Sequence, residues 1–262
     1  MSRKDILKDV ETVVIKVGTS SITGGGNSVF EGFMDSVAEQ VKKLKDMGKR
    51  VLIVSSGAIG VGLAAMEAKP KPKEVPIRQA AASVGQGILM QKWNESFQKQ
   101  GLIVSQILLT YDFYSDREKY LNLRNAIQTL LQYDVVPIIN ENDVVADEEL
   151  KGRTFGDNDW LSFLIAKLVK ADVLILLTTV DGLLDATGKR IPHVDSFKNV
   201  LKLVRAGEKG KLSKGGMDSK LKAVKAAVEA GVDTYIANGR KSVLVPILAG
   251  KSVGTFFPGS AL

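Results

Sequence analysis

Short runs of apolar, β-branched residues alternate along the chain with longer segments in which apolar residues recur every three to four positions. The short runs predict buried strands, and the longer segments predict amphipathic helices. In one such segment Leu221, Val224 and Val228 share a stripe, as expected of a helix that packs one face against a core. The pattern predicts strands over 12–17, 50–55, 102–110, 135–140, 173–179, 234–237 and 252–257, and helices over 30–47, 77–100, 116–133, 158–171, 217–230 and 243–248.

Strands that alternate with helices of this length favour βαβ units and a mostly parallel sheet. We therefore expect an α/β fold, a three-layer α/β/α sandwich with a central, mostly parallel sheet. The absence of a clear linker predicts a single domain over 1–262 with two lobes, approx. 1–170 and approx. 171–262. Two segments are predicted to be loops or excursions: the Pro/Lys-rich stretch 69–76, and 144–155, which has the character of a β-hairpin.

Composition excludes several kinds of chemistry. The 262 residues include no cysteine, so disulfides, thiolate metal sites and cysteine nucleophiles are excluded. His193 is the only histidine, which argues against a histidine-based triad or a multi-histidine metal site. Catalysis would have to use carboxylates, lysines, hydroxyls and backbone amides. The charged first residues and the lack of a long apolar run predict no signal peptide and no membrane contact, hence a cytoplasmic protein.

The net charge of +7 is concentrated in one part of the sequence. Residues 198–225 contain nine basic and two acidic residues, which leaves 27 of each sign elsewhere. One concentrated patch suits a polyphosphate ligand better than a nucleic-acid duplex, which needs a broad basic face. A solvated lysine-rich helix face remains an equally good interpretation for any single lysine in the window.

Small and polar residues follow four of the expected strands directly. In open α/β sheets ligands bind beyond the carboxyl ends of the strands, so these clusters are expected to meet in one crevice. They are residues 18–21 (GTSS), 55–57 (SSG), 140–143 (NEND) and 178–179 (TT).

Lys16 interrupts an otherwise apolar strand just before a glycine and three hydroxyl residues. A lysine near a buried strand end needs an anionic partner, because an unpaired buried charge is costly. The adjoining Gly-Thr-Ser amides also favour phosphate. The alternative is a lysine that points outward at a sheet edge.

Two further motifs precede expected helices. Residues 155–159 (FGDND) offer either an ordinary N-cap or a functional group of carboxylates. Gly215 and Gly216 lead into the helix that carries Lys220 in its first turn. Free amides there favour phosphate, and the helix dipole disfavours a lysine at that end unless an anion is present. A plain glycine-rich turn is the alternative interpretation.

Seven motifs occur in the order in which they stand in the glutamate 5-kinase family, part of the amino acid kinase superfamily, and the chain resembles that family from Lys16 to about Phe257. Two of them, Ser-Gly-Ala-Ile and Asn-Glu-Asn-Asp, distinguish this family from carbamate, aspartate and isopentenyl phosphate kinases. The motifs are 14–20 (VIKVGTS), 54–59 (VSSGAI), 78–86 (RQAAASVGQ), 116–122 (DREKYLN), 136–143 (VPIINEND), 156–159 (GDND) and 215–220 (GGMDSK).

The resemblance implies ATP-dependent phosphorylation of the γ-carboxylate of L-glutamate to L-glutamyl 5-phosphate, the first step of proline biosynthesis. It implies a glutamate-binding N-terminal lobe and a nucleotide-binding C-terminal lobe. Two alternatives stay open: another member of the superfamily that phosphorylates a different acid or phosphate, and a non-catalytic protein that binds nucleic acid or senses an amino acid.

The resemblance also implies roles for individual residues. Lys16 and Lys220 would hold the transferring phosphoryl group, with Asp159 orienting both lysines. Mg²⁺ would be bound mainly through the ATP phosphates, with no metal ligand from protein side chains. The substrate site would comprise Gly18, Ser56, Gly57, Asp143 and Asn158, and the nucleotide site Lys16, Thr178, Thr179, Lys214, Gly215, Gly216, Met217, Asp218, Ser219 and Lys220.

The family pattern carries further expectations about assembly and regulation. Relatives form dimers or tetramers, so we expect a homo-oligomer, with L-proline as a possible feedback inhibitor and with no nucleic-acid partner. Many relatives carry a C-terminal PUA domain, and we expect none here. Thr179 stands where relatives often have aspartate, and Lys214 where threonine is common.

Overall fold

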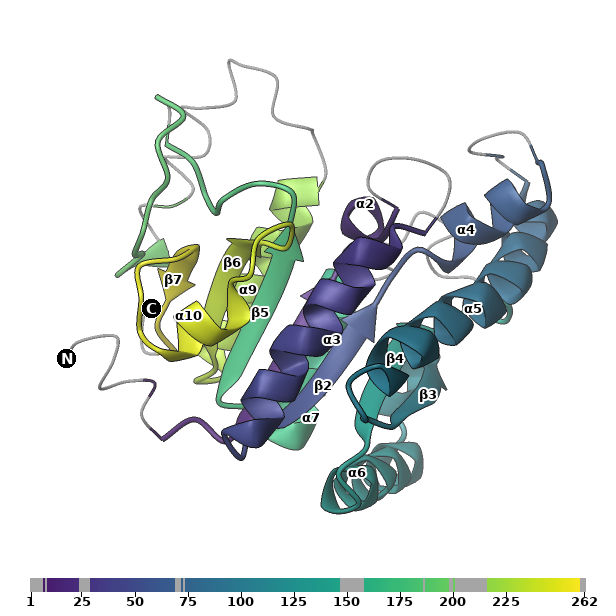
Figure 1. Ribbon diagram of the computed structural model, residues 1–262, viewed down its shortest axis with the longest axis horizontal. Helices are drawn as coiled ribbons and strands as arrows, with labels where there is room; N and C mark the ends of the chain where they lie inside the picture. The colour runs from purple at the N-terminus through teal and green to yellow at the C-terminus, as the bar shows by residue number, and fades with distance from the viewer. Residues whose placement is uncertain are drawn as a thin grey trace.

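A seven-stranded sheet forms the centre of the molecule in the computed structural model, which describes residues 7, 9–23, 29–68, 72, 74–146, 158–185, 187–197, 200 and 216–259 (Figure 1). The strands are β1 (Thr12–Val17), β2 (Arg50–Ser55), β3 (Val104–Leu109), β4 (Val136–Glu141), β5 (Val173–Thr178), β6 (Asp233–Asn238) and β7 (Thr255–Phe257). Their order is β3-β4-β2-β1-β5-β6-β7. All neighbours are parallel except β6 and β7, so the sheet is mostly parallel, as predicted.

Helices cover both faces of this sheet. On one face α3, α5 and α10 pack into a single apolar cluster with the strands, and on the other face α6, α7 and α9 form a second cluster. Figure 1 shows α3 in front of the sheet and α7 and α9 behind it. The helices are α2 (Thr19–Ile22), α3 (Glu31–Asp46), α4 (Ala58–Ala65), α5 (Val75–Gln98), α6 (Arg117–Gln132), α7 (Asn158–Val169), α9 (Gly216–Glu229) and α10 (Leu244–Leu248), with a 3₁₀ turn, η1, over Tyr111–Tyr114.

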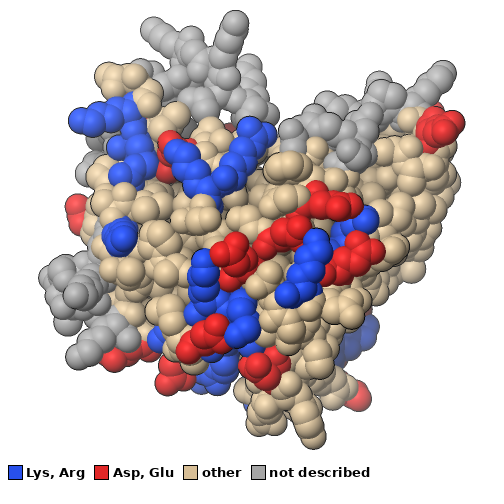
Figure 2. Space-filling view, viewed as in Figure 1, with Lys and Arg blue, Asp and Glu red and all other residues tan. Residues whose placement is uncertain are grey.

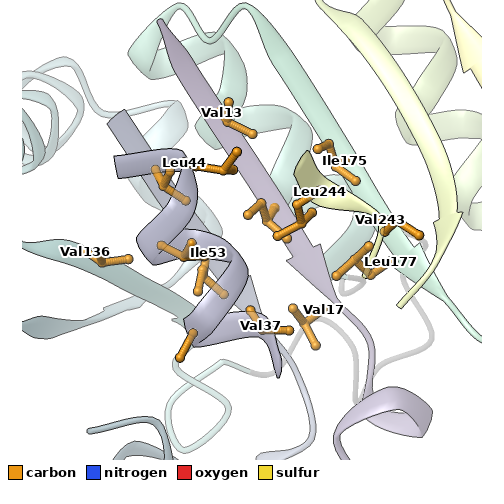
Figure 3. Close-up of a cluster of buried hydrophobic side chains, with 14 of the residues drawn as sticks. Val13, Val17, Val37, Leu44, Ile53, Val136, Ile175, Leu177, Val243 and Leu244 are labelled. Carbon is orange, nitrogen blue, oxygen red and sulfur yellow. The ribbon is translucent and has the colours of Figure 1, made fainter. Parts of the chain in front are cut away.

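The central strand β1 shows how the sequence builds the two layers. Val13 and Val17 point into the cluster shared with α3 and α10 (Figure 3), whereas Val14 points to the opposite cluster. Successive side chains of a strand face opposite sides, and both sides are covered here, so the strand is apolar except at its first residue, Thr12, and at Lys16. By the same alternation Lys16 lies on the α7 and α9 side.

The predicted α/β sandwich is confirmed, and every expected strand and helix has a counterpart. Two helices were not predicted, α2 and α4, which follow β1 and β2 directly. The first is a single turn, too short to show a helical period, and the second lies in a stretch that is rich in glycine and alanine. Most of the expected hairpin 144–155 lies outside the described residues, and the proposed division into lobes near residue 170 remains a prediction.

Backbone contact between α4 and α5 depends on two glycines. A Cβ atom added to Gly62 would lie 1.7 Å from the carbonyl oxygen of Ala81, and one added to Gly85 would lie 1.8 Å from the carbonyl oxygen of Ala58. Only glycine has no Cβ, so only glycine permits this approach. The start of α4 is thereby held directly against the long helix α5.

Figure 2 shows basic and acidic side chains close to one another on the surface, and no continuous basic face among the residues described. Ion pairs on and beside α3 join Lys43 to Glu39, Lys92 to Glu31 and Lys99 to Asp35. Much of the lysine-rich window 198–225 lies outside the described residues. Within the ranges that are described, no helix is both long and apolar enough to cross a membrane.

Candidate active site

One buried carboxylate binds two lysines at the carboxyl end of the sheet. The Nζ atom of Lys16 lies 2.6 Å from Asp159 Oδ1, and the Nζ atom of Lys220 lies 2.9 Å from Asp159 Oδ2. Asp159 is 1% exposed. Burial alone would raise the pKa of this carboxyl, but the charges and hydrogen bonds of the two lysines hold the pKa below its ordinary value. Asp159 is therefore an anion at neutral pH.

Three separate elements bring these side chains together. Lys16 sits one residue before the end of β1, Asp159 lies in the first turn of α7, and Lys220 follows the first turn of α9. The N-terminus of α7 favours the negative charge of Asp159, and that same charge compensates a lysine near the N-terminus of α9. Two cations face one anion, so the cluster carries one net positive charge and can attract a further anion.

A cavity of about 180 Å³ lies beside this cluster. The polar residues that follow β1, β2 and β4 meet here, as predicted from their positions in the sequence, whereas Thr178 and Thr179, the fourth predicted cluster, do not line this cavity. The volume is below the ~300–1,000 Å³ of pockets for drug-sized ligands, so the described part of the cavity suits a small molecule. Its lining residues are Lys16, Thr19, Ser56, Gly57, Ala58, Ile59, Gly60, Glu141, Asp143 and Asn158.

The cavity carries both signs of charge. Lys16 supplies an ammonium group, and Glu141 and Asp143 supply carboxyl groups. Burial raises the pKa of Asp143 to about 6, although the charge of Arg78 opposes the shift. A ligand with a carboxylate at one end and an ammonium group at the other would complement this arrangement.

Asn158 forms part of the cavity wall and is held by three acceptors. Its Nδ2 atom donates to the carbonyl oxygen of Ser55 at 3.1 Å, to Ser56 Oγ at 2.8 Å and to Asn140 Oδ1 at 3.0 Å. The side chain therefore joins the ends of β2 and β4 to the start of α7. This function goes beyond the helix cap that the sequence alone allowed.

Most of the predicted site residues gather in these two places. Lys16, Asp159 and Lys220 form the charged cluster, and Ser219 Oγ lies 3.4 Å from Asp159 Oδ2. The expected substrate residues Ser56, Gly57, Asp143 and Asn158 line the cavity, and a Cβ atom at Gly18 would be 3.6 Å from Lys16 Nζ.

Those predicted nucleotide residues that the structure describes lie at the same edge of the sheet as the charged cluster. Thr178 is the last residue of β5, with Thr179 directly after it, and Gly216, Met217 and Asp218 open α9. Their contacts with a nucleotide remain a prediction. Lys214 and Gly215 lie outside the described residues.

Several residues of the site were not singled out from the sequence. Glu141 is 4% exposed and lines the cavity, as do Thr19 and the first residues of α4. The signal for Glu141 was its place in the polar cluster that follows β4. Gln86 ends the motif 78–86, but nothing in the sequence assigned it a role; it does not line the cavity and instead accepts a hydrogen bond from Asn140.

The described residues offer little to a metal ion. Among them no group of three or more histidine, cysteine, aspartate or glutamate side chains is placed to hold one. Both oxygens of Asp159 are bound to lysines. The expectation that Mg²⁺ would be bound mainly through the ATP phosphates stays a prediction.

Comparisons with known proteins identify the family of this chain. Residues 11–238 match the amino acid kinase family. The glutamate 5-kinase of Methanosarcina barkeri is 47% identical over 97% of this chain and 70% of that protein. The glutamate 5-kinase of Clostridium acetobutylicum is 40% identical over 98% of this chain and 97% of that protein.

Solved structures show the same fold in more distant proteins. Giardia carbamate kinase superposes with a TM-score of 0.67 at 18% identity, over 95% of this chain and 99% of that one. The carbamate kinase of Giardia lamblia bound to AMP-PNP gives 0.66 at 17% identity, over the same shares of the two chains. Taken together with the sequence relatives, these matches show that the chain belongs to the amino acid kinase family and, within it, to the glutamate 5-kinases.

Proposed function

We propose that this protein transfers the γ-phosphoryl group of ATP to the γ-carboxylate of L-glutamate, forming L-glutamyl 5-phosphate and ADP. The observation that carries the proposal is the small cavity lined by one ammonium group and two carboxyl groups, whose Lys16 also belongs to the lysine pair on Asp159. The relatives named glutamate 5-kinase support glutamate over the other acids and phosphates of the family.

In this proposal the substrate lies across the cavity. Its ammonium group is bound by Asp143 and Glu141, and its γ-carboxylate extends toward Lys16. An amino acid too short to reach both the carboxyl groups and Lys16 would leave one of its charges unpaired. An unpaired buried charge is costly, so the length of the side chain would contribute to the choice of substrate.

The transfer needs no general base. The γ-carboxylate has an ordinary pKa of ~4.3 and is already ionised at neutral pH. One of its oxygens attacks the γ-phosphorus of ATP, a new O–P bond forms, and the bond to the β–γ bridging oxygen breaks as ADP leaves. Lys16 and Lys220 stabilise the charge on the phosphoryl oxygens, and Asp159 keeps both ammonium groups in place.

The direct test is γ-glutamyl hydroxamate formation from L-glutamate, ATP and Mg²⁺ with hydroxylamine present. We expect product with glutamate and none with aspartate, whose side chain is one methylene shorter. Product with another acid, or no product although ATP binds, would contradict the substrate assignment and leave only membership of the family.

The pKa of Asp143 predicts how activity depends on pH. Asp143 must be ionised to bind an ammonium group, so kcat/KM for glutamate should fall as the pH drops through about 6. An Asp143→Asn variant should have a raised KM for glutamate and should lose this acidic limb. Rates measured from pH ~5 to ~8 check both points, and a wild-type profile that stays flat to the acidic end would contradict the role of Asp143.

Asp143 should also make the stability of the fold depend on pH, in the direction opposite to its effect on activity. Its pKa in the folded protein, about 6, lies above the ordinary value of 3.8, so the folded state favours the protonated form. The contribution of this group to stability is therefore present at low pH and is lost as the pH rises from about 4 to about 6. Bound glutamate should reduce this loss by pairing the carboxylate.

Assembly and regulation extend the proposal. We infer that the protein forms a dimer or tetramer, which light scattering measures directly. We also infer that L-proline inhibits the reaction. Titrating L-proline into the hydroxamate assay at several glutamate concentrations measures that inhibition and distinguishes competition with glutamate from binding elsewhere.

A further inference from the structure

A chain of side-chain amides runs from the cavity to the edge strand of the sheet. Asn158 Nδ2 donates to Asn140 Oδ1 at 3.0 Å, and Asn140 Nδ2 donates to Gln86 Oε1 at 2.9 Å. Gln86 Nε2 then donates to Gln106 Oε1 on β3 at 3.0 Å. Four elements, α7, β4, α5 and β3, are thus joined by amides that all donate in the same direction.

Backbone groups fix that direction, so it does not depend on how each amide is turned. The carbonyl oxygen of Ser55 can only accept, and it lies 3.1 Å from one amide atom of Asn158, which must be the nitrogen. The backbone N–H of Glu141 can only donate, and it lies 2.9 Å from one amide atom of Asn140, which must be the oxygen. Both amides of the inner pair are therefore assigned.

These assignments make Gln86 necessary. With its oxygen facing Glu141, Asn140 presents its amide nitrogen to α5 and needs an acceptor there. Asn140 is 1% exposed, so bulk water does not supply one, and a buried donor without a partner is costly. Gln86 Oε1 is the acceptor. If it were removed, the buried nitrogen of Asn140 would lose its acceptor, and the Asn140 side chain that accepts from Asn158 would be held less firmly.

Asn158 stands at the cavity end of this chain of amides. Its amide nitrogen donates to Ser55, Ser56 and Asn140, so only its amide oxygen is left to accept a hydrogen bond. Asn158 Oδ1 is buried and has no hydrogen-bond partner among the described residues. Asn158 itself lines the same cavity as Asp143 and Glu141. The position of its side chain therefore affects the wall against which a substrate would lie.

We propose that Gln86 is a positioning residue for glutamate: through Asn140 it helps to hold Asn158, which lines the cavity that would bind the substrate. This inference rests on the proposed function and deepens it. Gln86 touches neither the substrate nor the phosphoryl group. Its effect should therefore appear in the binding of glutamate and not in the binding of ATP.

Two substitutions at one position separate this role from simple packing. Gln86→Met keeps the length of the side chain and removes the acceptor, and the loss of one buried hydrogen bond should raise KM for glutamate about five- to tenfold. Gln86→Glu keeps an acceptor for Asn140 and should leave KM close to the wild-type value. KM for ATP should stay unchanged in both variants, with kcat altered much less than KM for glutamate.

Gln106→Leu is the matched control at the outer end of the chain. Gln106 is exposed, so water can replace its contact with Gln86, and KM for glutamate should not change. The proposal is overturned if Gln86→Met leaves KM for glutamate unchanged, or if Gln86→Glu raises it as much. A fall in melting temperature and kcat without a change in KM would assign Gln86 a structural role only.

Calorimetric titration of L-glutamate into the wild-type protein keeps the two proposals distinguishable. A wild-type protein that neither binds nor phosphorylates glutamate overturns the proposed function and this inference with it. If the wild-type protein phosphorylates glutamate and the Gln86→Met variant has an unchanged KM for glutamate, only the role of Gln86 is overturned. Glutamate binding without turnover leaves the prediction standing, with the dissociation constant measured in place of KM.

Discussion

Replacing Asp159 by asparagine is expected to lower kcat by about 10²–10³-fold. The amide has almost the shape of the carboxylate but one acceptor atom and no charge, so it cannot hold Lys16 and Lys220 together. The two ammonium groups then repel each other and leave the positions from which they stabilise the phosphoryl oxygens. The hydroxamate assay measures the loss, and a kcat within threefold of wild type would contradict the assignment.

The same substitution should also destabilise the fold. Breaking a buried ion pair by neutralising one partner typically costs about 3–5 kcal/mol, because the other charge remains buried. Asp181→Asn is the matched control, since Asp181 makes an exposed ion pair with Lys241, and exposed pairs contribute about 0–1 kcal/mol. Chemical denaturation of both variants separates the loss of stability from the loss of activity.

Replacing Gly85 by alanine is expected to lower the free energy of unfolding by about 3 kcal/mol, the upper end for overpacking a core. The added methyl group would lie 1.8 Å from the carbonyl oxygen of Ala58 and 2.5 Å from the amide nitrogen of Gly62. Backbone atoms cannot rotate away as a side chain can, so α4 must move off α5. Because α4 begins at the cavity, KM for glutamate should rise as well.

Gly87→Ala provides the control two residues along the same helix. A Cβ atom at Gly87 meets nothing within 4 Å, so this substitution should stabilise the protein by up to ~1 kcal/mol through helix propensity alone. Thermal and denaturant unfolding of both variants tests the contrast. Equal stabilities for the two alanine variants would show that the helices can separate at little cost.

The fold could be predicted from the sequence because both faces of the sheet are buried. Strands such as β1 and β5 are then almost wholly apolar and short, and the helices between them keep a single apolar stripe, so element type can be assigned locally. The elements that were missed, α2 and α4, are short, and α4 also contains two glycines. Their helical form depends on packing against neighbours that the local sequence does not reveal.

Only part of the site could be predicted from the sequence, again from local patterns of apolar and polar residues. Lys16 was conspicuous as a charge in an apolar strand, and the polar clusters after β2 and β4 could be placed at one edge of the sheet by topology. The role of Gln86 could not be found in this way. Its partner Asn140 is 54 residues away, and the amide chain exists only once α5 packs beside β4.

The position of β1 has a consequence for the growing chain. The first strand to be synthesised becomes the centre of the sheet: it pairs with β2 on one side and with β5 on the other. Roughly 120 residues separate the end of β2 from the end of β5, and at ~5–20 residues per second their synthesis takes about 6–25 s. Throughout that interval an apolar strand keeps one unpaired edge, which can recruit another chain. Slower translation between β2 and β5 would therefore lower the yield of folded protein without changing a single residue.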